Sequence, residues 1–209
     1  MMNKLNEGIK QLGLEVSDEE SGKLEIYINE LLIWNAKLNL VSARDGDQLI
    51  VRHILDCLAG LEYIRSLEGE HVGDLGSGAG LPGMIMAIFM KDRRFTLVER
   101  SGKKAGFLRS TAALLGLVDR LQVADTDLRN IKTEFDIVTL RAFRDFGDFY
   151  GEIKKVTSRN GCIAAYKGRV ASIRYDLDSA KLSSDAAEIR PLRVPFLDEE
   201  RHMLIIHPW

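Results

Sequence analysis

Three closely spaced glycines follow an apolar segment that ends in an acid and a leucine: His71-Val72-Gly73-Asp74-Leu75 precedes Gly76-Ser77-Gly78-Ala79-Gly80. Glycine has no Cβ, so it lets the backbone pack closely against a ligand and adopt positive φ angles. Pro82 suits the first turn of a helix, where its missing N–H is not needed. The free N–H groups at such a helix start favour a carboxylate or a phosphate. The segment predicts a strand-to-helix turn that binds a nucleoside-type cofactor.

The spacing of the glycines favours one cofactor class. A dinucleotide-binding loop follows Gly-x-Gly-x-x-Gly, and Leu81 stands at its third glycine position. Asp74 is typical of S-adenosylmethionine-dependent methyltransferases, where an acid orients loop amides and the cofactor's amino group. Glu99 ends the next apolar segment, and its carboxylate can accept hydrogen bonds from both ribose hydroxyls. We therefore expect S-adenosylmethionine, held by a set that comprises Asp74, Gly76, Ser77, Gly78, Gly80 and Glu99.

Two aspartates compete for the adenine of that cofactor. Asp125 and Asp127 both follow a third apolar segment, and Leu128 comes next. An acidic side chain there can accept a hydrogen bond from the exocyclic amine, while an apolar neighbour packs on the ring. Either aspartate can instead simply cap the turn. The sequence leaves this choice open.

Cations cluster at positions where the strands of a parallel sheet would end. Arg141 and Lys167 each follow an apolar segment, and Lys103 opens a predicted helix. Because the carboxyl ends of parallel strands border the ligand cleft, these side chains should point at bound ligands. The net charge is only −2, so RNA binding would need such a local patch. The expected basic rim comprises Arg44, Arg52, Lys103, Arg141, Arg144, Lys167 and Arg169.

The segment Arg52-His53-Ile54-Leu55-Asp56 allows two interpretations. At 100° per residue, Arg52 and Asp56 fall opposite the apolar stripe of a helix, and His53 borders that stripe. By periodicity alone, Arg52 and Asp56 form an ion pair on a solvated face, worth about 0.2–0.5 kcal/mol. The alternative is a role at a ligand cleft.

The order of the elements predicts an α/β fold. Residues 4–67 read as helical, with an irregular connection over Asn35–Asp47 and Asp47 as the N-cap of the second long helix. From His71 onward, strands and helices alternate, which predicts a doubly wound parallel sheet. The expected strands are His71–Leu75, Phe95–Glu99, Leu121–Ala124, Phe135–Leu140, Cys162–Tyr166, Glu188–Phe196 and His202–His207, and the helices between them are Pro82–Met90, Gly102–Leu115 and Asp145–Thr157.

By analogy, a parallel sheet that ends in an antiparallel hairpin, without long helices in the last stretch, is the Rossmann-like architecture of class I methyltransferases. We expect residues 1–67 to be a helical extension packed on a methyltransferase core of residues 68–209, within one compact domain. No apolar stretch is long enough to span a bilayer, and the N-terminus lacks the apolar core of a secretion signal. Cys57 and Cys162 lie far apart and form no metal-ligand pair. We expect a cytoplasmic monomer without a metal.

Several segments together resemble the RsmG family, formerly called glucose-inhibited division protein B. They are Trp34-Asn35, Asn39-Leu40, Arg44-Asp45, Val51–Asp56, Gly76–Gly83, Gly102-Lys103, Phe107–Arg109, Arg141–Phe143, Lys167-Gly168 and Glu200–His202, and they cover nearly the whole chain. The resemblance implies methylation of N7 of one guanosine in bacterial 16S ribosomal RNA, as naked RNA or within the small subunit. It also implies cofactor contacts at Gly76, Leu81, Asp127, Leu128 and Arg141.

The chain departs from the family at two places. Glu99-Arg100 stands where the family more often has Asp-Ser, and Asp127-Leu128 replaces a pair that usually ends in Glu. The resemblance also favours the cleft interpretation of Arg52 and Asp56.

Guanine N7 carries a lone pair and no proton, so its methylation needs alignment rather than a general base. We expect the base to be presented unstacked. Asp56 would accept hydrogen bonds from guanine N1–H and N2–H, and Arg141 or Lys103 would donate to O6. The expected catalytic set is Arg52, His53, Asp56, Lys103, Arg141 and Lys167. The competing functions are a nicotinamide-dependent oxidoreductase and a non-catalytic ribosome-binding or assembly factor.

Overall fold

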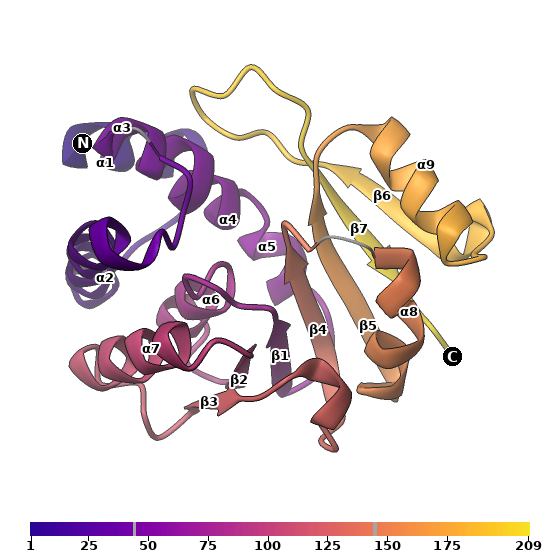
Figure 1. The fold of residues 1–209 in the computed structure, drawn as a ribbon. Helices are drawn as coiled ribbons and strands as arrows, with labels where there is room; N and C mark the ends of the chain where they lie inside the picture. The colour runs from indigo at the N-terminus through magenta and orange to yellow at the C-terminus, as the bar shows by residue number, and fades with distance from the viewer. Residues whose placement is uncertain (44, 144–145) are drawn as a thin grey trace.

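A computed structural model describes residues 1–43, 45–143 and 146–209 (Figure 1). The N-terminal part contains α1 Met2–Gln11, α2 Asp18–Leu38, α3 Gly46–Leu49, the π-helix η1 Ile50–Leu55, α4 Asp56–Ala59 and α5 Leu61–Arg65. The remainder contains β1 His71–Leu75, α6 Gly83–Phe89, β2 Arg94–Glu99, α7 Gly102–Leu114, β3 Leu121–Asp125, η2 Leu128–Asn130, β4 Phe135–Arg141, α8 Phe146–Lys155, β5 Thr157–Lys167, α9 Val170–Ser179, η3 Ser184–Ala186, β6 Ala187–Pro191 and β7 His202–Ile206.

The strands of the described residues form one seven-stranded sheet in the order β3-β2-β1-β4-β5-β7-β6. Strands β1 to β5 are parallel, and β7 runs antiparallel to both β5 and β6. This confirms the predicted doubly wound sheet with an antiparallel end. The strand order reverses between β1 and β4, so the glycine loop after β1 lies at the switch point, where such sheets bind ligands.

Both faces of the sheet are buried against helices. Successive side chains of a strand point to opposite faces, so neighbouring residues belong to different clusters. In β5, Cys162 and Ala164 face a cluster formed with the N-terminal helices, α6 and α7. Ile163 and Ala165 face the other cluster, which contains α8 and α9. Helices on both faces explain the nearly continuous apolar runs of the central strands.

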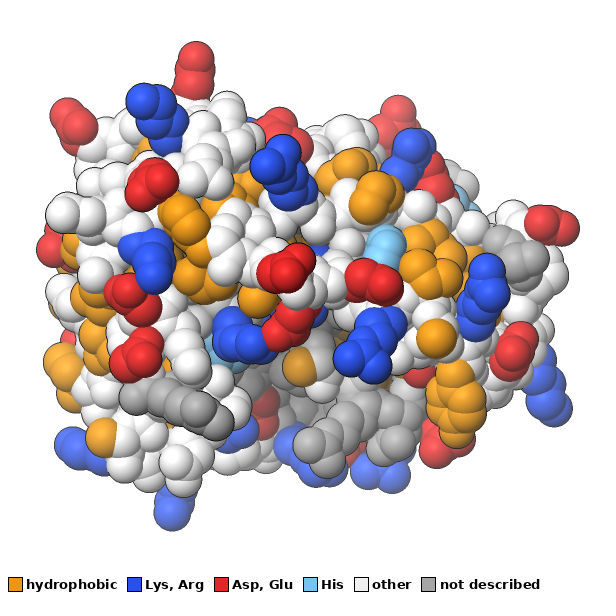
Figure 2. All heavy atoms as spheres, turned by 90° about the horizontal axis from the view of Figure 1, so that it is seen from above, with side chains coloured by type: hydrophobic (Ala, Val, Ile, Leu, Met, Phe, Trp, Pro, Cys, Tyr) orange, Lys and Arg blue, Asp and Glu red, His pale blue; other side chains and the backbone are white. Residues whose placement is uncertain are grey.

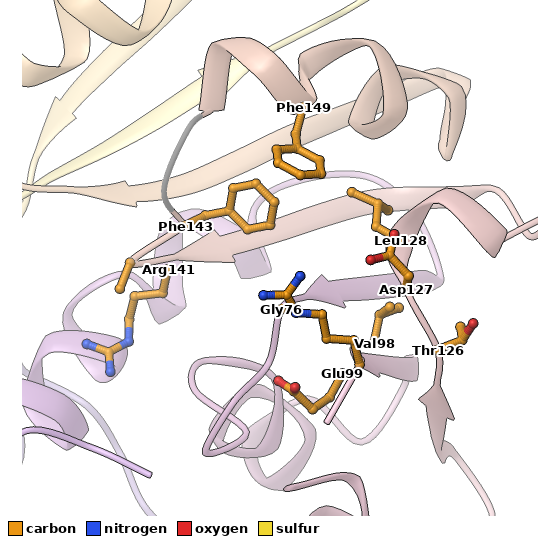
Figure 3. Close-up of a pocket in the computed structure, with 11 residues that line it drawn as sticks. Gly76, Val98, Glu99, Thr126, Asp127, Leu128, Arg141, Phe143 and Phe149 are labelled. Atoms are coloured by element: carbon orange, nitrogen blue, oxygen red, sulfur yellow. The ribbon is translucent and has the colours of Figure 1, made fainter. Parts of the chain in front are cut away.

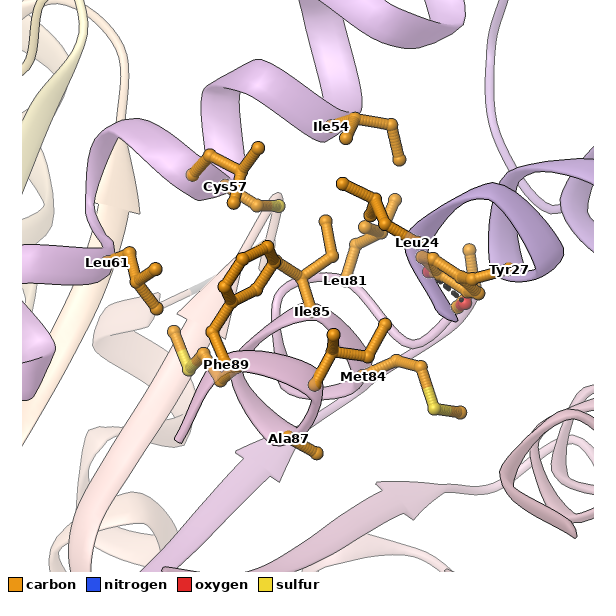
Figure 4. Close-up of a cluster of buried hydrophobic side chains, with 14 of the residues drawn as sticks. Leu24, Tyr27, Ile54, Cys57, Leu61, Leu81, Met84, Ile85, Ala87 and Phe89 are labelled. Carbon is orange, nitrogen blue, oxygen red and sulfur yellow. Dashed lines mark hydrogen bonds between the residues drawn. The ribbon is translucent and has the colours of Figure 1, made fainter. Parts of the chain in front are cut away.

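The N-terminal helices share the core of the sheet. The buried cluster runs from α2 through η1 and α4 to α6, and Figure 4 shows Leu24, Ile54 and Leu81 among its members. Helix α2 starts with a capping box in which Ser17 and Glu20 bond to each other's backbone amides. The buried Tyr27 hydroxyl donates a hydrogen bond of 2.9 Å to the carbonyl of Ala79. Helix α2 therefore contacts the glycine loop directly.

Three sequence expectations about the elements are wrong. Asp45, not Asp47, caps α3, while Asp47 pairs with Lys4 and the N-terminal amine. Strand β6 ends at Pro191, well before the expected Phe196, because the chain leaves the sheet as a loop that the Leu192 amide closes by donating to the Arg201 carbonyl. Helix α9 was not expected, since Ile173 and Leu177 are its only buried side chains and give little periodicity.

Cys57 and Cys162 are both buried free thiols. Within the described ranges, no helix combines the length and the apolar character needed to cross a bilayer.

We predict that Tyr27→Phe lowers the free energy of unfolding by about 1–3 kcal/mol, because the buried Ala79 carbonyl loses its donor. Urea denaturation measures this change. Tyr175→Phe removes the same atom from an exposed side chain and should change stability by less than about 0.5 kcal/mol. Equal effects of the two substitutions would contradict the assigned contact.

Candidate functional site: two adjoining cavities at the switch point

The glycine loop connects β1 to α6 with three residues at positive φ. These φ angles are +69° at Gly76, +56° at Gly78 and +86° at Gly80. Residues other than glycine rarely adopt this backbone conformation. The amides of Gly76 and Ser77 donate to the carbonyl of Val98 at 2.9 and 3.0 Å. The loop is thereby fixed to the end of β2.

The buried carboxylate of Asp74 connects the elements on either side of the loop. One carboxylate oxygen accepts a hydrogen bond from the Thr139 hydroxyl at 3.0 Å, and the other accepts one from the Gly83 amide at 3.2 Å. Burial raises the pKa of Asp74 to about 6. The side chain lies outside the lining of the neighbouring cavity. Asp74 therefore positions the loop, β4 and the start of α6.

A cavity of about 470 Å³ opens beside the loop (Figure 3). The rings of Phe143 and Phe149 meet edge to face on one side, with centroids 5.7 Å apart. The cavity is lined by Gly76, Val98, Glu99, Arg100, Thr126, Asp127, Leu128, Arg141, Ala142, Phe143 and Phe149. Its size is that of a small-molecule site.

Glu99 is fixed in the wall of this cavity by two amides. One carboxylate oxygen accepts from the Gly78 amide at 2.9 Å and the other from the Ser101 amide at 2.8 Å. Each carboxylate oxygen has a further lone pair, so ribose hydroxyls can still bind.

Of the other residues predicted to contact the cofactor, some line this cavity and some lie outside it. Asp127 and Leu128 line the cavity. The side chain of Arg129 and its backbone amide donate to Asp127 and lower the pKa of that carboxyl to about 2. Asp125 pairs with Arg109 outside the cavity. The side chain of Leu81 is part of the hydrophobic core (Figure 4).

Ser77 and Gly80 lie outside the cavity lining and support the loop. The Ser77 hydroxyl donates to the backbone carbonyl of Asp74 at 2.8 Å. A Cβ atom at Gly80 would lie 2.9 Å from Leu108, so glycine allows α7 to approach the loop.

A second cavity of about 340 Å³ adjoins the first, and Arg141 and Ala142 line both. Its walls come from η1, the ends of β4 and β5, and the loop 192–201 between β6 and β7. The lining residues are Ser42, Arg52, His53, Asp56, Arg141, Ala142, Tyr166, Lys167, Gly168 and Arg201.

Asp56 occupies a buried position in this cavity, contrary to the periodicity of an α-helix. The side chain is 4% exposed, and Arg52 pairs with Glu199 rather than with Asp56. Five consecutive residues, Ile54–Leu58, are all buried, so this segment is covered on every side and its burial does not follow a single apolar stripe. The prediction of a surface ion pair between Arg52 and Asp56 is therefore wrong.

Asp56 binds two arginines. Its oxygens accept from Arg141 at 3.0 Å and from Arg201 at 3.1 Å, which leaves only the remaining lone pairs for the expected guanine contact. Burial raises the pKa of Asp56, and the two guanidinium groups oppose that rise.

Arg141 is held at the boundary of the two cavities. One terminal nitrogen donates to Asp56, and the other donates to Nδ1 of His53 at 2.9 Å. Its Nε is buried and has no hydrogen-bond partner among the described residues. Figure 3 shows the side chain pointing away from Phe149.

His53 is the neutral acceptor of this arrangement. Its Nδ1 accepts from Arg141, and its Nε2 lies 3.3 Å from the Ser42 carbonyl. Burial and the charge of Arg141 lower the pKa of His53 to about 4. The imidazole is therefore uncharged at neutral pH.

The expected basic rim is largely paired with acids. Lys167 binds Asp176 at 2.7 Å, and Arg52 binds Glu199. Lys103 is exposed and lies outside the linings of both cavities. Figure 2 shows acidic and basic side chains interspersed over the upper face. Arg44 and Arg144 lie outside the described residues.

Three residues of the two cavities had no role predicted from the sequence: Arg201, Phe143 and Phe149. The first two belong to segments that carry the resemblance, Glu200–His202 and Arg141–Phe143. Their roles were not assigned because Arg201 is 145 residues from its partner Asp56, and Phe143 meets Phe149 across a change of element.

Solved structures resemble this fold at low sequence identity. A human methyltransferase 10 domain containing protein has a TM-score of 0.59 at 12% identity, covering 93% of this chain and 100% of that one. A SAM-dependent methyltransferase from Aquifex aeolicus has a TM-score of 0.58 at 15% identity, covering 78% and 93%. The fold is that of class I S-adenosylmethionine-dependent methyltransferases.

Curated relatives match over almost their entire length. The Ribosomal RNA small subunit methyltransferase G of Borrelia turicatae is 34% identical over 99% of this chain and 100% of its own. The protein of the same name from Acinetobacter baumannii is 34% identical over 97% and 96%. The sequence model described as "GidB: rRNA small subunit methyltransferase G" matches residues 20–204. The chain therefore belongs to the GidB family of small-subunit rRNA methyltransferases.

Proposed function

We propose that this enzyme transfers a methyl group from S-adenosylmethionine to N7 of a guanosine in 16S ribosomal RNA. The observation that carries the proposal is the junction of two cavities at Arg141. One lies on the glycine loop and is suited to a nucleoside cofactor, and the other is lined by arginines. The identity of the RNA and the position of the methyl group come from the family.

The first cavity fits S-adenosylmethionine by its size and by the acceptors in its lining. Glu99 would hold the ribose, and the backbone around Gly76 would approach the methionyl part. Asp127 is the better candidate for the adenine amine, because Asp125 is outside the cavity and paired with Arg109. Leu128 would pack on the ring. When bound, the cofactor supplies an electrophilic methyl group on a sulfonium.

The residues of the second cavity orient the acceptor and do not remove a proton from it. N7 has no proton to lose, His53 is already bound to Arg141, and Asp56 is already bound to two arginines. The buried Arg141 Nε has no partner among the described residues, so a guanine O6 or a cofactor carboxylate can accept from it. This arrangement supplies alignment.

We predict label from S-adenosylmethionine on N7 of one guanosine when the protein is incubated with small subunits from a strain lacking this gene. Chain cleavage at N7-methylguanosine maps the position, and naked 16S RNA in a parallel reaction identifies the substrate form. Label on another atom or on protein would refute the proposed acceptor. Calorimetric titration with S-adenosylhomocysteine and with NAD tests the oxidoreductase alternative directly.

We predict that Glu99→Gln weakens binding of S-adenosylhomocysteine by about 10- to 100-fold, because hydrogen bonds to a charged carboxylate are lost. Asp125→Asn is the matched control, since Asp125 lies beside Glu99 in the sheet but outside the cavity. Its effect should be under about threefold. A larger effect of Asp125→Asn would move the adenine contact to that residue.

We predict that Asp56→Asn lowers kcat for methyl transfer by about 100-fold or more while S-adenosylhomocysteine binding changes little, because Arg141 and Arg201 lose their anion. Thermal unfolding of the same variant separates this effect from misfolding. Loss of cofactor binding with normal kcat at saturation would instead place Asp56 in the cofactor site.

A further inference from the structure

A glutamate on the loop 192–201 occupies the space between two arginines of the second cavity. The Glu199 carboxylate accepts from Arg52 and from Arg201, the latter at 3.1 Å. Both hydrogen bonds lower the pKa of Glu199, so it is ionised at neutral pH. Arg52 and Glu199 are each 42% exposed, so this contact is open to solvent.

Arg201 is held in place without Glu199. Its Nε donates to Asp56 at 3.1 Å, and another nitrogen donates to its neighbouring Glu200 carbonyl at 2.9 Å. Asp56 is buried, and the Arg201 side chain is only 19% exposed. Departure of Glu199 would therefore leave Arg201 oriented toward the same space.

Two arginines that share one carboxylate can bind an RNA phosphate in its place. The guanidinium fork binds carboxylate and phosphate oxygens in the same bidentate manner. Exposed ion pairs within a protein contribute little to stability. Exchange of Glu199 for a phosphate thus costs little and preserves the charge balance of the cavity.

We propose that Arg52 and Arg201 bind a backbone phosphate of the RNA substrate and that Glu199 occupies this site until the RNA displaces it. The inference rests on the proposed function for the identity of the polyanion. Among the described residues, the other cation of this cavity that pairs with an acid outside its lining is Lys167, and its partner Asp176 belongs to α9 and not to the loop 192–201. Glu199 is therefore the acid that must leave when the phosphate binds at Arg52 and Arg201.

The test compares Glu199→Gln with Asp198→Asn, because each removes one negative charge from adjacent positions of the loop. Asp198 forms no ion pair among the described residues, whereas Glu199 binds both arginines. Binding of 16S RNA is measured with S-adenosylhomocysteine present. We expect Glu199→Gln to lower the Kd for RNA by about two- to tenfold. Asp198→Asn should lower it less, and Arg52→Ala should reduce the gain from Glu199→Gln.

Three results would overturn the proposal. Equal gains for both variants would show a general effect of loop charge. Weaker binding by Glu199→Gln would show that Glu199 orients the arginines for another purpose, and absence of RNA binding by both wild type and variant would exclude the site. Failure of the proposed function is read separately, as the absence of methyl transfer by the wild type.

Discussion

The carboxylate of Asp56 is the contact on which the second cavity depends. Removing a charge from water is costly, and this carboxylate is buried, so it requires the two guanidinium groups that bind it. Arg141 comes from the end of β4, and Arg201 precedes β7. One ion cluster thus connects the N-terminal helices, the centre of the sheet and its antiparallel end.

A second buried carboxylate gives the glycine loop its position. Asp74 accepts hydrogen bonds from Thr139 of β4 and from the Gly83 amide. Tyr27 of α2 donates a hydrogen bond to the Ala79 carbonyl within the loop. The loop is thus fixed by elements from three parts of the chain. The N-terminal helices also share one buried cluster with the sheet.

The sequence predicted the sheet and the glycine loop well, because alternation and glycine spacing are local signals. Periodicity alone placed Asp56 on a solvated face, because an apolar stripe does not show that other elements cover the opposite side of the helix as well. The sequence also missed the pairing of Asp56 with Arg201 and of Arg52 with Glu199, because these contacts join residues 145 and 147 positions apart. The cations were found from the strand ends, but their acidic partners were not.

The shared wall at Arg141 has a thermodynamic consequence. This side chain borders both cavities, so a ligand that moves it in one cavity changes the free energy of binding in the other. Such coupling is reciprocal: each ligand alters the affinity for its neighbour by the same factor. The order in which cofactor and RNA bind therefore does not change the stability of the ternary complex. The affinity of the protein for the cofactor can nevertheless differ between the complex with the unmethylated base and the complex with the methylated base. Product release from one cavity is thereby linked to occupancy of the other.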